Sequence, residues 1–67
     1  MNIRTDFTAP EVEYLREQCN FTRQQRAIFD LRVSDHSIIE ICDRLHISEA
    51  TAGREIQKIK HKIVRVL

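Results

Sequence analysis

Apolar residues recur every three or four positions in four stretches of the chain, and each stretch follows a polar residue able to cap a helix. The last stretch is the clearest, with spacings of four, three and four residues at Ala52, Ile56, Ile59 and Ile63. Such spacing places the apolar side chains on one face of an α-helix. The pattern predicts an all-α, four-helix domain with helices over residues 9–19, 22–32, 37–45 and 48–66.

Three of the predicted helices begin with a Ser or Thr that is followed three residues later by Glu or Gln. The pairs are Thr8 with Glu11, Thr22 with Gln25, and Ser37 with Glu40. In this capping box each side chain bonds the backbone N–H of the other residue, so two donors left open at the helix start gain partners. Ser48 is expected to cap the fourth helix. No stretch alternates apolar and polar residues at a period of two, so we expect no β-wing.

Residues 37–59 have the pattern of two helices joined by a tight turn at His46. Histidine is among the residues enriched at positive φ, which such a turn requires, and Ile47 is expected to fill the core beneath it. This pattern predicts a helix-turn-helix, whose second helix enters the DNA major groove. We expect one domain over residues 1–67, in which residues 1–20 form an N-terminal extension and first helix beside a tri-helical core.

Composition excludes several classes of protein. The 67 residues suffice for one domain. No apolar run approaches the roughly 20 residues that cross a bilayer, so we expect no membrane partner. The N-terminus lacks the apolar segment of a signal peptide, which makes the cytoplasm the expected location. No nucleophile is grouped with a base and an orienting residue, so we expect neither an enzyme nor a cofactor.

Cys19 and Cys42 are predicted to be reduced, buried thiols, because a disulfide scaffold uses more cysteines in a secreted chain. Cys42 and His46 are four residues apart and can share a helix face, as metal ligands do. Only His36 and His61 could complete such a site, and they supply no second paired spacing. We therefore expect no metal, with zinc as the alternative.

Charge is distributed unevenly, although the net charge is only +1. Residues 1–43 carry five basic and eight acidic side chains, whereas residues 44–67 carry six basic and two acidic ones. The positive part contains the helix predicted to enter the groove, where contacts to DNA phosphates would be made. A solvated, lysine-rich helix end also suits the helix dipole and stays open as an alternative.

The outward face of the last helix carries the candidate chemistry. Arg54 can grip guanine through two hydrogen bonds, Gln57 can pair with adenine, and Glu49 can accept from cytosine. Ser48 and Thr51 at the helix start can donate hydrogen bonds to a phosphate, and the free N–H groups there favour an anion. The predicted DNA-binding residues are Ser48, Glu49, Ala50, Thr51, Gly53, Arg54, Gln57 and Lys58.

Gly53 is unusual within a predicted helix, where glycine costs roughly 1 kcal/mol relative to alanine. It either allows close approach of the helix backbone to DNA or avoids a clash within the chain. Both explanations are open at this point.

The spacing of these residues resembles that of a known family of domains. The resemblance is carried by Phe21, Thr22, Arg23, Gln24, Ile28, Leu31, Ser37, Glu40, Ile41, Cys42, Leu45, Ile47, Ser48, Thr51, Ala52 and Ile56. Over residues 21–63 the chain resembles the DNA-binding domains of LuxR-type regulators, and the same pattern, followed by the basic segment 58–63, is similar to region 4 of bacterial sigma factors. The resemblance implies double-stranded DNA as partner, with Glu49, Ala50, Gly53 and Arg54 as base readers. In the sigma relatives this helix reads a promoter element.

The chain departs from the family pattern at a few positions. Ala52 stands where the pattern favours Val or Ile, and Gly53 where it favours Lys or Arg. Ile38 and Ile39 replace polar residues, so we expect the first helix or a partner to cover them.

Two functions are therefore expected. The first is a sequence-specific DNA-binding transcription regulator that uses the helix beginning at Ser48. The alternative is a protein-interaction module with weak DNA binding. That module would bind RNA polymerase or another regulator, or form a homodimer through the C-terminal helix, where Val64, Val66 and Leu67 extend the apolar character.

Overall fold

The structure, a computed structural model, describes residues 7–67. It consists of four helices: α1 (Ala9–Gln18), α2 (Arg23–Val33), α3 (Ile38–Leu45) and α4 (Glu49–Val66). Each bound lies within one residue of the prediction, and the described residues contain no strand. The predicted all-α fold of four helices is confirmed.

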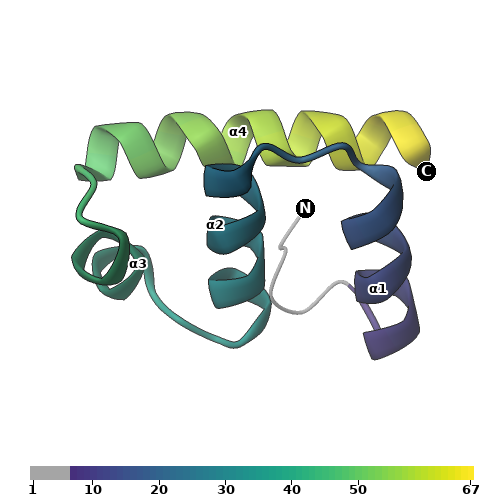
Figure 1. Cartoon of the computed structure of the whole chain (residues 1–67), viewed down its shortest axis with the longest axis horizontal. Helices are drawn as coiled ribbons and strands as arrows, with labels where there is room; N and C mark the ends of the chain where they lie inside the picture. Colours follow the sequence, from purple (N-terminus) through teal and green to yellow (C-terminus); the bar gives the residue numbers. More distant parts are fainter. Residues whose placement is uncertain (1–6) are drawn as a thin grey trace.

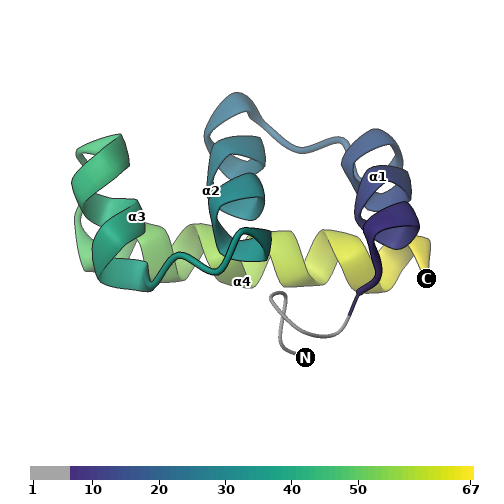
Figure 2. The same ribbon diagram turned by 90° about the horizontal axis from the view of Figure 1, so that it is seen from below.

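Helix α4 is the element against which the other three helices pack. It lies along the long axis of the molecule, with α3 at its N-terminal end, α2 beside its middle and α1 at its C-terminal end (Figures 1 and 2). Its 18 residues correspond to about 27 Å of helix, and the longest dimension of the molecule is 29 Å. One helix therefore connects both ends of the fold.

The buried face of α4 is the predicted stripe of Ala52, Ile56, Ile59 and Ile63. The residues that meet it in the core are Leu15 of α1, Ile28 and Phe29 of α2, and Ile41 of α3. The rings of Phe21 and Phe29 lie 5.1 Å apart between centroids, so the segment before α2 also packs on this core. The predicted stripe is confirmed, and it determines which face of α4 is left outward.

All three predicted capping boxes are present, at Thr8, Thr22 and Ser37. Ser48 caps α4 by accepting a hydrogen bond from the backbone N–H of Thr51. Each such cap stabilises a helix start by about 1 kcal/mol relative to alanine. His46 ends α3 with φ of 55° and ψ of 47°, as the turn prediction required.

Two expectations about side-chain burial are corrected by the structure, although cover of Ile38 and Ile39 by a partner stays a prediction. Ile38 and Ile39 are exposed by 37% and 70%, and α1 lies at the far end of α4 from α3 (Figures 1 and 2), so the first helix does not cover them. Ile38 precedes the buried Ile41 by three residues and therefore lies one turn further out along α3. Of the two cysteines only Cys19 is buried, whereas Cys42 is half-buried.

No helix within residues 7–67 combines the length and the apolar character that crossing a membrane requires.

Candidate nucleic-acid interface

The turn between α3 and α4 determines how the start of α4 is presented. His46 adopts the left-handed conformation at the end of α3, and α3 and α4 cross each other beyond this turn (Figures 1 and 2). The backbone N–H of Ile47 donates to the carbonyl of Cys42 at 3.1 Å, and the Ile47 side chain packs against the core. Ser48 then begins α4 at the end of the molecule (Figure 1). The left-handed conformation of His46, which few side chains tolerate, thus determines the angle at which α4 follows α3.

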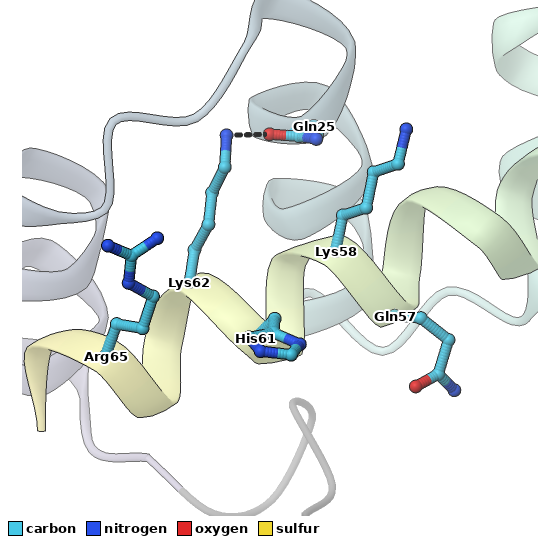
Figure 3. Close-up of a pocket in the computed structure, with 6 residues that line it drawn as sticks. All are labelled: Gln25, Gln57, Lys58, His61, Lys62 and Arg65. Carbon is cyan, nitrogen blue, oxygen red and sulfur yellow. Dashed lines mark hydrogen bonds between the residues drawn. The ribbon is translucent and has the colours of Figure 1, made fainter.

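The predicted DNA-binding residues all lie in the first three turns of α4 or at its cap, opposite the buried stripe. Thr51 and Gly53 are half-buried, whereas the exposed members are Ser48, Glu49, Ala50, Arg54, Gln57 and Lys58. The predicted set covers about 200° of the helix circumference, and Gln57 and Lys58 point to different sides of α4 (Figure 3). Most of the set is open to a partner.

The two hydroxyl groups at the start of α4 bond each other. Ser48 Oγ donates to Thr51 Oγ1 at 3.0 Å and accepts from the Thr51 backbone N–H at 3.1 Å. Arg54 Nη2 also donates to Thr51 Oγ1, at 3.5 Å. These contacts make capping the first role of Ser48 and Thr51. A phosphate at this end would instead meet the first N–H groups of the helix, which have no partner within it.

Gly53 faces open space. A Cβ built there would meet no heavy atom of residues 7–67 within 4 Å beyond its chain neighbours and its own helix backbone. The explanation that glycine avoids a clash within the chain is therefore wrong. The other explanation, close approach of the helix backbone to DNA, stays a prediction.

A polar network that the sequence analysis missed lies behind the candidate reading face. Gln25 is 3% exposed, and its Nε2 donates to Glu55 Oε1 at 3.1 Å. Its Oε1 accepts from Lys62 Nζ at 2.6 Å and from the Thr22 backbone N–H at 3.1 Å. Lys58 Nζ lies 3.2 Å from Glu55 Oε2. One buried amide thus connects the start of α2 to two turns of α4.

This network lowers the pKa of Glu55. The ammonium group of Lys58 is the largest cause, followed by the amide of Gln25, and both favour the ionised carboxylate. A signal for the network was present in the sequence, because Gln25 precedes the buried Ile28 and Phe29 by three and four residues. A polar residue on an apolar stripe needs partners.

An open groove of about 500 Å³ lies between the start of α2 and the outer face of α4. We call it the α2–α4 groove, and its lining residues are Gln25, Gln57, Lys58, His61, Lys62 and Arg65. In Figure 3 the Lys62 side chain extends toward Gln25, with Lys58 and Arg65 on α4 to either side of it. The groove overlaps the predicted DNA-binding set at Gln57 and Lys58 and continues toward the end of α4.

Comparison of the chain with models of known protein families, with curated proteins and with solved structures finds no match. Within residues 7–67 no three His, Cys, Asp or Glu side chains are grouped so that they could hold a metal ion. The functional interpretation therefore depends on the exposed face of α4 and the α2–α4 groove.

Proposed function

We propose that this chain is a sequence-specific DNA-binding protein that regulates transcription, without enzymatic activity, and reads the major groove with the first three turns of α4. The observation that carries the proposal is the arrangement of α4 itself. Its buried stripe faces the core, while the exposed Glu49, Arg54 and Gln57 and the open space at Gly53 support readout of bases by the remaining surface. The resemblance to LuxR-type domains and to region 4 of sigma factors supports the same assignment.

The exposed side chains have the donors and acceptors that base readout requires. Arg54 would donate to O6 and N7 of guanine, Gln57 would pair with adenine, and Glu49 would accept from N4 of cytosine. Lys58 would contact a phosphate, which adds affinity but no sequence information. Each good bidentate pair contributes about 1–3 kcal/mol of discrimination between bases.

Selection of bound sequences from random double-stranded DNA tests the proposal. An enriched motif is expected, and Arg54→Gln should weaken binding to that motif by about 1–3 kcal/mol and relax the preference at one base pair. Lys60→Gln is the matched control, since it removes one positive charge from the same helix at a position that is not among the predicted DNA-binding residues. If Arg54→Gln keeps both the affinity and the preference, α4 does not read DNA as proposed.

A second candidate function is protein interaction, and the exposure of Ile38 and Ile39 favours it. These neighbouring apolar side chains are 37% and 70% exposed at the start of α3, and exposed apolar patches often mark interaction sites. RNA polymerase or another regulator is the proposed partner. Ile39→Ser should then weaken binding to purified RNA polymerase while leaving DNA binding intact. Equal binding by both forms to polymerase would count against this role.

Homodimerisation is the other form of this interaction. Val64 and Leu67, near the end of α4, are 61% and 74% exposed. A homodimer through this end would require a palindromic DNA site, because the symmetry of the site mirrors that of the protein. A monomeric mass by light scattering at high protein concentration would rule the dimer out.

A further inference from the structure

Helix α4 is longer than the major groove of DNA is wide. Its 18 residues correspond to about 27 Å, whereas the major groove is about 12 Å wide. Lys58 follows the first residue of the helix by nine positions, which is about 14 Å of rise. If the first turns occupy the major groove, the helix beyond Lys58 reaches its edge, where the phosphate backbone of DNA lies.

The side chains from Lys58 toward the C-terminal end of α4 line the α2–α4 groove. Lys58, His61 and Arg65 are exposed and follow one another at spacings of three and four residues, so they share one face of α4. Among the described side chains that line this groove, none is acidic. The nearest carboxylate in contact with it is that of Glu55, which pairs with Lys58.

Lys62 differs from the other basic residues that line the groove, because its ammonium group is hydrogen-bonded within the protein. Its Nζ donates to Gln25 Oε1 at 2.6 Å and to the backbone carbonyl of Asn20 at 3.0 Å. It is therefore held within the protein and positions α4 against α2. Arg65 and His61 carry no such bond to α2, and they are exposed on either side of Lys62 along the helix.

We propose that the α2–α4 groove binds the phosphodiester backbone of DNA that flanks the bases read by the start of α4. Arg65 supplies the main contact, because its planar guanidinium can donate two parallel hydrogen bonds to one phosphate. His61 donates an imidazole N–H to a neighbouring phosphate, and Lys62 is a positioning residue. This inference rests on the proposed function, but it assigns sequence-independent contacts to the second half of α4.

The salt dependence of DNA binding by the full chain tests the proposal. Log affinity falls linearly with log salt concentration, and each phosphate contact contributes about 0.9 to the steepness of this fall. The slope is given below as its absolute value. Arg65→Gln should therefore lower the slope by about 0.9 and leave the preferred sequence unchanged. Arg65→Lys should keep the slope, because it keeps the charge. Lys60→Gln, which removes the same charge outside the groove, should leave the slope at the wild-type value.

Two results would overturn the groove proposal while leaving the proposed function intact. In the first, Arg65→Gln binds with the wild-type slope. In the second, Arg65→Gln and Lys60→Gln lower the slope equally, which would show an effect of net charge and no local contact. If the wild-type chain binds no DNA at low salt, the proposed function itself fails, and this inference fails with it.

Discussion

Lys62 Nζ on α4 lies 2.6 Å from Oε1 of Gln25, a side chain in the first turn of α2 that is only 3% exposed. The same amide donates to Glu55, about two turns earlier on α4. This bridge holds the proposed DNA-reading helix in its orientation, because it fixes two points of α4 against one point of α2.

Replacing Gln25 with Leu should destabilise the fold by about 1–3 kcal/mol, since the backbone N–H of Thr22 and the side chains of Glu55 and Lys62 lose a hydrogen-bond partner. The neighbouring change Gln24→Leu affects an exposed side chain and should stay within about 0.5 kcal/mol of wild type. Urea unfolding measures both. Equal stability of the two variants would mean that the bridge contributes nothing.

The pH dependence of stability should report on Glu55. Its pKa in the folded state lies below its ordinary value of 4.5, owing to Lys58 and then Gln25. A lowered folded-state pKa gives stability that is present above pH 4.5 and is lost as pH falls through the folded-state pKa. Glu55→Gln should therefore flatten the acid side of a stability–pH curve, measured by urea unfolding.

Glu40 provides the comparison for this experiment, because its pKa is also lowered, chiefly by the backbone N–H of Ser37. Glu40→Gln should flatten the same side of the curve, and the double variant should be flatter than either single variant. A Glu55→Gln curve that is parallel to wild type below pH 4.5 would contradict the lowered folded-state pKa of Glu55.

Gly53→Ala should separate stability from DNA binding. A Cβ at this position meets open space, so the variant should gain about 1 kcal/mol of helix propensity. Its melting temperature should rise by roughly 4–8 °C, given the small size of the domain. DNA affinity should fall, because the added methyl group keeps DNA from the helix backbone. Unchanged DNA affinity would contradict the proposal that Gly53 allows DNA to approach the helix backbone closely.

Substitutions at His46 should follow the backbone conformation rather than the chemistry of the imidazole. The left-handed conformation costs a residue with a Cβ about 1–2 kcal/mol, so His46→Gly should be neutral or stabilising. His46→Val should be clearly destabilised, because a β-branched side chain is disfavoured at positive φ. Asp43→Gly, which places a glycine inside α3, should lower the free energy of unfolding by about 0.5–1 kcal/mol. Thermal unfolding of the three variants checks the order, and a destabilised His46→Gly would contradict it.

Most of the fold was predictable because its signals are local. The capping pairs and the spacing of Ala52, Ile56, Ile59 and Ile63 depend on residues within one or two turns of each other. The positive φ of His46 was predictable for the same reason. These features need no knowledge of how the helices are arranged in space.

The features that were mispredicted or missed depend on tertiary arrangement. Ile38 belongs to the apolar stripe of α3 by spacing, yet its exposure depends on where the start of α3 lies relative to the core. The bonds of Gln25 join residues 30 and 37 positions apart, and no local pattern indicates such partners. The open space at Gly53 likewise required the structure. The DNA-binding residues themselves remain a prediction.

The two cysteines give this fold a pair of built-in chemical reporters. Cys19 caps the end of α1 and is buried, and that burial raises the pKa of its thiol although the charge of Lys62 acts against it. Cys42 is half-buried in α3, at the other end of α4. The alkylation rate of buried Cys19 therefore follows the opening of the α1 end of the molecule, whereas that of half-buried Cys42 follows access to the α3 end. Footprinting with an alkylating reagent can thus distinguish protection by DNA near α3 from a general tightening of the fold, without any introduced label.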